Sequence, residues 1–443
     1  MKKIAKLSLV AAVAVAGLTT ANAQPLEEAI KNVDVSGSVV YRYNDYSNDV
    51  VGGQSTQTNN YKVALNLSSK VNEDVKFNSR FLVGNDSNAG FAQLGNASGD
   101  AADVDTNANV SLSNAYFGYT GIQNTTVNIG KQGLTTPWTV AIDSDGNEQT
   151  GTGVLALSTV GPVTLAAAYF NQTNLNASSD SAVNGVSLYK KSRATGTTLS
   201  NTGVSDATVN TLVGDDVLDG SDDIATVGAI LAAGPVTIDA WYLDMNNVFN
   251  TYTIGAKSSL DLSGAKVGID ARYASLSLDK GVAVALSPVI SSTTVVEEDN
   301  SIAKLVLTGK AGIFDAKVAY AKTGKEGGLT ALDNDATTTL LGWSLTSNGK
   351  ADADYWQVVA GVDILSNLNL SANYGNLQYI GAANSTTDIE EEEIYAQLLY
   401  KMSKNLTTYV RYGTYTKETS AQGVAAVDNN DDVRGRLQVE YTF

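Results

Sequence analysis

The chain contains no cysteine and no histidine in 443 residues. Disulfides, thiol nucleophiles, imidazole bases and zinc sites with the usual ligands are therefore excluded. Serine hydrolases need a general base that is usually histidine, so most hydrolytic mechanisms would lack their usual base here. No glycine-rich phosphate loop follows a strand and opens a helix, which argues against nucleotide use. The composition disfavours an enzyme.

Long apolar runs are missing beyond the first 23 residues. Met1–Ala23 has three early lysines, then an apolar run, then Ala-Asn-Ala, which is the pattern of a secretory signal peptide. We expect cleavage there, leaving residues 24–443 as a single domain. No later stretch reaches the roughly 18 apolar residues that a spanning helix needs. Such an exported chain can cross a membrane only with strands.

Basic residues and prolines are scarce. There are 29 Lys and Arg against 46 Asp and Glu, and only five prolines beside 40 glycines and 21 tyrosines. Loss of the three signal-peptide lysines leaves 26 basic residues and a mature net charge of −20. This sign argues against a nucleic-acid partner and towards cations. The glycines and tyrosines suit a large sheet with aromatic rims.

The last eleven residues alternate strictly between two chemical faces. One face has Val433, Gly435, Leu437, Val439, Tyr441 and Phe443, and the other has Arg434, Arg436, Gln438, Glu440 and Thr442. One face suits lipid and the other suits water, which is typical of the closing strand of a transmembrane β-barrel. Residues 33–43 alternate in the same way, and we expect them to pair with this strand. An edge strand of a soluble sandwich remains the alternative for this stretch alone.

Eight short turns separate pairs of alternating strands. They fall at 72–74, 121–124, 161–162, 234–235, 262–264, 311–313, 365–367 and 403–405. Eight such turns between nine strand–loop–strand units predict 18 strands, an even number as a closed antiparallel barrel requires. The fold class is therefore all-β, a transmembrane barrel with short periplasmic turns. Long polar loops face the outside, the longest at 171–222, 277–300 and 323–354.

The third long loop, residues 133–151, is the most informative for function. Its candidate functional residues are Trp138, Asp143, Asp145 and Glu148. Candidate partners on the water-facing side of the first three strands are Arg42, Lys62 and Arg80. If the loop folds into the lumen, its acids oppose these cations, and the resulting transverse field selects solutes by charge. A solvated surface loop with incidental acids is the alternative.

Two further acidic clusters raise the question of calcium. They are Asp215, Asp216, Asp219, Asp222 and Asp223 in or beside the longest loop, and Glu390–Glu393 at the start of a strand. Carboxylates can bind Ca²⁺, but neither cluster has the ligand spacing of an EF-hand. A solvated, negatively charged rim is the favoured interpretation, and a metal site stays undecided. No other cofactor is expected.

Several segments resemble the campylobacterial (epsilonproteobacterial) major outer membrane porin family. They are PLEEAIKNVDVSGSVVYRY at 25–43, GKQ at 130–132, PW at 137–138, AID at 141–143 and GTGV at 151–154. The resemblance implies an 18-stranded trimeric porin with the third loop at the constriction and a preference for cations. It carries over Trp138, Asp143 and the flanking glycines. Asp145 and Glu148 lie in the segment SDGNEQ, which departs from the family pattern.

These observations favour a passive outer-membrane diffusion channel for small hydrophilic solutes and ions, with a weak cation preference. Its expected partners are such solutes and cations, outer-membrane lipid and lipopolysaccharide, and two further copies of the chain, but no nucleic acid. The alternative is a surface adhesin or structural barrel that displays long loops. The length of those loops, for which we find no resemblance, supports this alternative.

Overall fold

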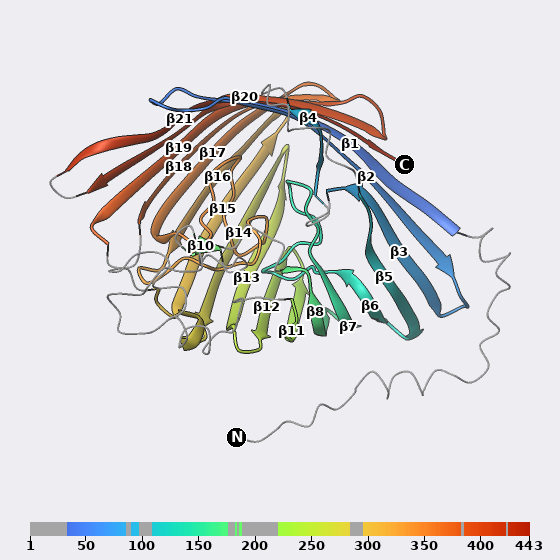
Figure 1. Cartoon of the computed structure of the whole chain (residues 1–443). Coiled ribbons are helices and arrows are strands. Elements are labelled where there is room, and N and C mark those ends of the chain that lie inside the picture. Colours follow the sequence, from blue (N-terminus) through green and yellow to red (C-terminus); the bar gives the residue numbers. More distant parts are fainter. Residues whose placement is uncertain are drawn as a thin grey trace.

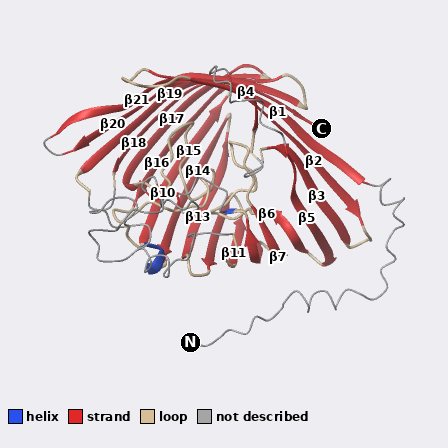
Figure 2. Cartoon of the chain, viewed as in Figure 1, coloured by secondary structure: helices blue, strands red, loops and turns tan. Residues whose placement is uncertain are grey.

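The computed structural model describes residues 33–85, 90–96, 109–175, 182–183, 186–187, 220–283, 296–381, 385–421 and 424–443. The expected signal peptide and most of the longest loop, including Asp215, Asp216 and Asp219, lie outside these ranges. Within them, no helix is both long enough and apolar enough to span a bilayer. A short helical turn at 280–283 is visible between strands in Figure 2.

Eighteen antiparallel strands form one closed barrel (Figure 1). The first nine are β1 (Val33–Asn48), β2 (Thr56–Lys70), β3 (Val75–Gly84), β5 (Asn109–Ile122), β6 (Thr125–Gly133), β7 (Thr150–Val160), β8 (Val163–Thr173), β11 (Ile224–Ala233) and β12 (Val236–Met245). The others are β13 (Phe249–Leu262), β14 (Ala265–Leu278), β15 (Asp299–Ala311), β16 (Phe314–Thr323), β17 (Ala351–Leu365), β18 (Leu368–Ile380), β19 (Thr387–Lys401), β20 (Leu406–Ala421) and β21 (Val424–Thr442).

Three short strands lie within loops. β4 (Ala92–Asn96) adds to the upper part of β2, while β9 (Ala182–Val183) and β10 (Val186–Ser187) pair only with each other. The barrel closes between β1 and β21, in a register that runs from Ser38 opposite Thr442 to Asn48 opposite Asp432. The predicted strand number, antiparallel order and pairing of the first and last strands are confirmed.

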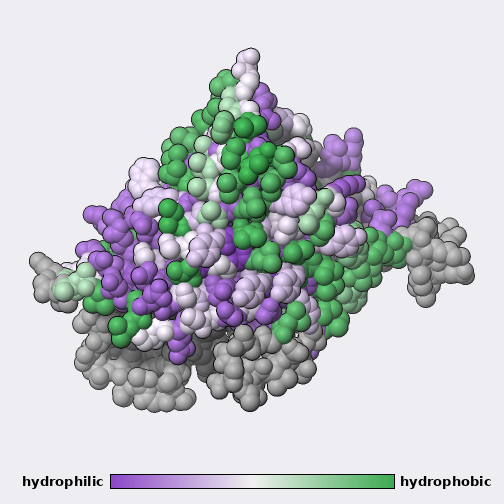
Figure 3. Space-filling view, turned by 90° about the horizontal axis from the view of Figure 1, so that it is seen from above, coloured by the Kyte–Doolittle hydropathy of each residue, from purple (hydrophilic) through white to green (hydrophobic). Residues whose placement is uncertain are grey.

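The outer face of the barrel is apolar. Outward side chains on adjacent strands form rows across the sheet, such as Ile269, Leu307 and Val318, which are 40–42% exposed and paired in register. Figure 3 shows hydrophobic side chains running from the top of one face into its middle and along its lower right, with hydrophilic ones mainly at the left and upper right. Because successive side chains in a strand alternate, the polar residues between these positions face inward. This is the side-chain distribution of a barrel surrounded by lipid.

All eight predicted short turns join consecutive strands. Gly161 and Gly234 have φ of 58° and 60°, which glycine adopts without strain, and a proline follows each. The expectation of a long loop at every other connection is wrong between β12 and β13, where only residues 246–248 intervene. There Met245 accepts a hydrogen bond from the backbone of Val248, which closes a tight turn.

Two loops pack inside the barrel against its inner wall. We call them the third loop (134–149, between β6 and β7) and the seventh loop (324–350, between β16 and β17). Leu134 and Trp138 of the third loop and Leu329 and Leu332 of the seventh share one buried apolar cluster with strands β8 and β11–β14. A second cluster holds Leu340 and Leu345 of the seventh loop against β14–β18 and β20. Both loops are thus ordered by apolar burial within the barrel.

Candidate functional site

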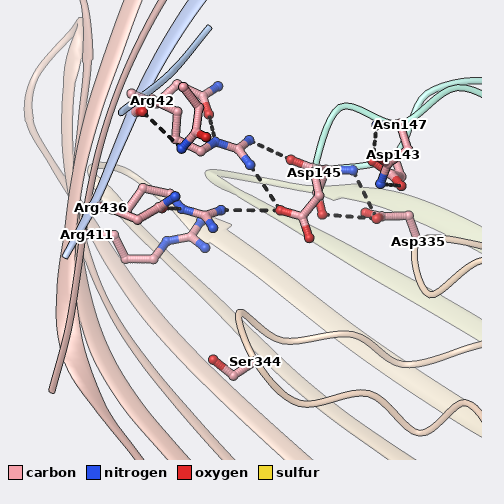
Figure 4. Close-up of polar contacts among 12 residues, drawn as sticks. Arg42, Asp143, Asp145, Asn147, Asp335, Ser344, Arg411 and Arg436 are labelled. Carbon is pink, nitrogen blue, oxygen red and sulfur yellow. Dashed lines mark hydrogen bonds and ion pairs between the residues drawn. The ribbon is translucent and has the colours of Figure 1, made fainter. Parts of the chain in front are cut away.

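The tip of the third loop contacts the wall formed by β1 and β21. Arg42 Nη1 lies 3.0 Å from Asp145 Oδ1, and Arg42 Nη2 donates to the carbonyl of Ser144 at 2.6 Å. Arg436 Nη1 approaches the same Asp145 oxygen at 3.7 Å (Figure 4). The Asp145 side chain is 66% exposed, whereas those of Arg42 and Arg436 are 7% and 11% exposed. At this contact the carboxylate is therefore the charge most open to water.

Glu148 is the buried counterpart of Asp145. Its Oε1 lies 2.8 Å from both Lys62 Nζ and Arg80 Nη2, and its side chain is 2% exposed. Ser113 donates a further hydrogen bond to the other carboxylate oxygen. Burial alone would raise the pKa of Glu148, but hydrogen bonds and charges from Arg80 and Lys62 outweigh it and hold the pKa below its ordinary value. This carboxylate attaches the loop to β2, β3 and β5.

Among the described residues, no ion pair joins Asp143 to Arg42, Lys62 or Arg80, the wall cations proposed from the sequence. The two carboxylate oxygens of Asp143 accept hydrogen bonds from the backbone and side-chain amides of Asn147, both at 2.7 Å. These two bonds close a tight turn, since the short side chain of an aspartate can accept hydrogen bonds from residues a few positions further along the chain. The carboxylate of Asp143 is therefore buried within its own turn. Burial raises the pKa of Asp143 to about 6, and the neighbouring charges of Asp145 and Asp335 add to this shift.

Trp138 is fully buried in the apolar cluster and lines no open space. Its ring packs among residues of the barrel wall and of the seventh loop. Its carbonyl accepts a hydrogen bond from the backbone of Leu332 at 2.8 Å. The tryptophan therefore fixes the base of the third loop and joins it to the seventh.

The seventh loop is a second component of the site that the sequence did not reveal. Its Asp335 Oδ2 accepts hydrogen bonds from the backbone and hydroxyl of Ser144, both at 3.0 Å. The backbone of Thr338 donates to the carbonyl of Pro137 at 3.2 Å. From the wall, Lys304 Nζ donates to the carbonyls of Thr337 and Thr339. Asp335 thus lies beside Asp145, on the side away from the arginines (Figure 4).

The wall opposite these acids carries more arginines than expected. Arg411 on β20 lies directly opposite Arg436 on β21, and Arg434 is two positions before Arg436 on the same face. Arg434 pairs with Asp432 at 2.5 Å and lies over the ring of Tyr415 at 4.1 Å. The alternation of the last strand had placed two of these arginines on the water-facing side, but no local pattern linked them to a loop.

The cluster Glu390–Glu393 is not a solvated rim, because the strand divides it between two faces. Glu391 and Glu393 point inward and are buried, while Glu390 and Glu392 are on the outer face. Glu391 accepts hydrogen bonds from Tyr379 and Tyr415, and Lys350 Nζ lies 3.5 Å away. Glu393 accepts from the backbone N–H groups of residues 343 and 344 in the seventh loop, at 2.9 and 2.7 Å.

No group of three or more acidic side chains suited to a metal ion occurs in the described ranges. Asp222 and Asp223 are the only members of the other acidic cluster within them. The calcium question therefore stays a sequence-based expectation for the remaining residues.

A closed barrel of 18 antiparallel strands, apolar outside and lined inside by charged walls and folded loops, is an outer-membrane porin. The chain belongs to the Campylobacter major outer membrane protein family, whose model matches residues 1–443. The resemblance drawn from short segments is thereby confirmed over the whole chain. The outer membrane is its location.

Solved structures with the same fold are distant in sequence. OccK2 (OpdF) of Pseudomonas aeruginosa, in complex with glucuronate, is 14% identical with a TM-score of 0.65, covering 93% of this chain and 98% of that one. OccAB3 of Acinetobacter baumannii is 13% identical (TM-score 0.64, 93% and 99% covered). OpdK of P. aeruginosa with vanillate is 14% identical (TM-score 0.63, 93% and 98% covered). No curated protein sequence matches.

Proposed function

We propose that this porin is a passive channel for small hydrophilic solutes and ions, with a weak preference for cations. The observation that carries this proposal is the unequal exposure of the charges at the contact of the third loop with the wall. Asp145 exposes most of its side chain, whereas Arg42 and Arg436 expose about a tenth or less of theirs. A permeating ion therefore meets the carboxylate through water and the guanidiniums through a partly apolar surface.

Two further features support the same proposal. Asp335 adds a second carboxylate beside Asp145, and the mature chain carries a net charge of −20 by sequence. The acids on the loops and the arginines on the wall also create a field across the passage, which orders dipolar solutes. The chain also lacks histidine and cysteine, the usual catalytic bases and nucleophiles, which supports transport by diffusion without catalysis.

The test is the reversal potential of the purified protein in a planar bilayer under a potassium chloride gradient. We expect cation preference, and we expect Asp145→Asn to lower the cation-to-anion permeability ratio roughly twofold. A charge ~8 Å away in water, screened by ~0.1 M salt, is worth ~0.25 kcal/mol to the cation and the same with opposite sign to the anion, so the ratio changes by ~0.5 kcal/mol. The matched control is Asp261→Asn, which removes an acid 78% exposed near the end of β13, 3.6 Å from Lys266 Nζ. An equal effect of both variants, or anion preference, would contradict the proposal.

The precursor and the assembly are part of this proposal. The sequence supports removal of residues 1–23 and a single barrel domain from 24 to 443, so the mature chain should begin at Gln24 by mass spectrometry. The family resemblance supports a homotrimer embedded in outer-membrane lipid and lipopolysaccharide. Light scattering of the detergent-solubilised protein should then give three chains per particle, and a single chain would refute the trimer.

A further inference from the structure

The arginines of β20 and β21 stand close together, and one of them has no acid partner among the described residues. Arg434 pairs with Asp432, and Arg436 Nη1 lies 3.7 Å from Asp145. Arg411 and Arg436 occupy directly opposed positions of an antiparallel pair, where like charges destabilise a sheet. In the described part of the chain, Arg411 forms no ion pair, and its only hydrogen-bond acceptor is Gln397 Oε1, at 2.6 and 3.0 Å. A guanidinium has five N–H donors, so most of those of Arg411 remain open to a ligand.

Aromatic rings surround this unpaired guanidinium. Arg411 Cζ lies 5.0–5.3 Å from the ring centroids of Trp343, Tyr395 and Tyr409, and Arg436 Cζ lies 5.9 Å from the ring of Trp343. The indole also packs edge-on against Tyr395 at 5.3 Å. Such contacts hold a guanidinium in place through the attraction of its charge to the ring quadrupole, but they do not neutralise that charge, because the ring carries no net charge. The charge of Arg411 thus stays available, whereas Arg436 already donates to Asn44 and Tyr46 and lies 3.7 Å from Asp145.

Trp343 reaches this wall from the seventh loop and is held there by Glu393. The Glu393 carboxylate accepts hydrogen bonds from the backbone of Trp343 and Ser344, so this acid is engaged by the loop. The close approach requires Gly342, where a Cβ atom would lie 1.9 Å from Glu393 Oε1 and 2.7 Å from the Tyr355 hydroxyl. The indole is partly exposed beside Arg411 and Arg436, which places an aromatic surface next to the unpaired guanidinium of Arg411.

We propose that Arg411, Arg436 and Trp343 form a binding site for small organic anions that carry a carboxylate on a planar ring. Arg411 donates to the carboxylate oxygens through its open N–H groups, Arg436 adds Nη1, because its Nε and Nη2 are engaged by Asn44 and Tyr46, and the indole packs against the ring. Arg42 and Arg436 lie beside Asp145 whereas Arg411 does not, so the site is on the β20 side of the loop contact (Figure 4). It rests on the proposed diffusion function, in which such solutes enter the lumen.

The probe is benzoate, added to single channels of the purified full-length protein at neutral pH. We expect reversible interruptions of the potassium chloride current, and we expect Arg411→Gln and Trp343→Ala each to raise the half-blocking concentration about tenfold, as for loss of a charge-assisted or stacking contact. Arg411→Lys should give an intermediate loss because it keeps the charge but not the planar fork. Lys257→Gln, which removes a half-exposed lumen cation from β13, should leave the response unchanged.

Two related probes separate charge from shape. Benzyl alcohol keeps the ring without the carboxylate, and acetate keeps the carboxylate without the ring, so both should be much weaker blockers than benzoate. Equal blocking by acetate would overturn the role of Trp343, and equal blocking by benzyl alcohol would overturn the role of the arginines. A conducting, cation-preferring channel that ignores benzoate would refute this site alone. Absence of conductance would instead refute the diffusion function.

Discussion

Asp145 and Glu148 lie three positions apart in the third loop, yet the structure gives them different tasks. Glu148 is buried between Lys62 and Arg80, and removing one member of a buried ion pair typically costs about 3–5 kcal/mol because the other charges lose their partner. Asp145 is mostly exposed, and exposed ion pairs contribute at most about 1 kcal/mol. Glu148 therefore anchors the loop, while Asp145 is free to act on passing ions.

Asp143 should make the channel sensitive to pH near neutrality. Its pKa is raised from 3.8 to about 6. Between these two pH values Asp143 is protonated in the folded loop but already ionised in the unfolded chain. The loop thus loses stability, and gains a negative charge, as the pH rises through about 6. Cation preference measured by reversal potential should increase between about pH 5 and about pH 7, and no histidine titrates in that window.

Asp143→Asn should abolish this step, because an amide keeps one acceptor for Asn147 but does not ionise. Asp261→Asn, at an exposed position near the end of β13, should retain it. A step of undiminished size in Asp143→Asn would mean that another group titrates.

At the residue scale, positions on the strands could be predicted from the sequence, but contacts made by the loops could not. Strand alternation alone was enough to propose Arg42, Lys62 and Arg80 for the inner wall. The role proposed for Arg411 could not be predicted in this way, because it depends on contact with Trp343. That residue is 68 positions away and lies in a loop with no periodic pattern. The direction in which the Asp143 side chain points could not be predicted either, because it depends on whether the loop turns at Asn147.

At the scale of elements, the short turns and the inward loops behave differently. The turns were predictable because glycine, asparagine and proline specify them locally. The fold of the seventh loop was not predictable, because the loop is ordered by apolar contacts with distant strands. It is also ordered by hydrogen bonds that join its two ends, which we call its base. At that base Gly349 donates to the carbonyl of Gly328 at 2.8 Å. A Cβ atom at Gly328 would lie 1.9 Å from the backbone oxygen of Lys350, which cannot move aside.

Gly328→Ala should therefore open the base of the seventh loop and leave the barrel folded. Amide hydrogen exchange within residues 324–350 should become at least about tenfold faster, which corresponds to ~1.4 kcal/mol of lost local stability. Gly309→Ala is the matched control, since a Cβ there meets nothing within 4 Å and the backbone is ordinary extended strand. Unchanged exchange in Gly328→Ala would show that the loop is held by its apolar contacts alone.

At the scale of the whole molecule, stability depends on keeping the two faces of the sheet in different solvents. Leu307 and Thr308 are neighbours on β15, but Leu307 lies in an outward apolar row with Ile269 and Val318, whereas Thr308 faces inward opposite Lys317.

Leu307→Arg should cost about 2–4 kcal/mol if it lies near mid-bilayer, and so should lower the temperature at which the barrel unfolds in heat-modifiability gels. Thr308→Arg introduces the same charge one position along, where water solvates it and Lys317 adds only a modest repulsion. The alternation predicts a clear loss for the first variant and a small one for the second. The reverse order would mean that the barrel is inside out relative to this assignment, and the charges of the candidate site would then face lipid.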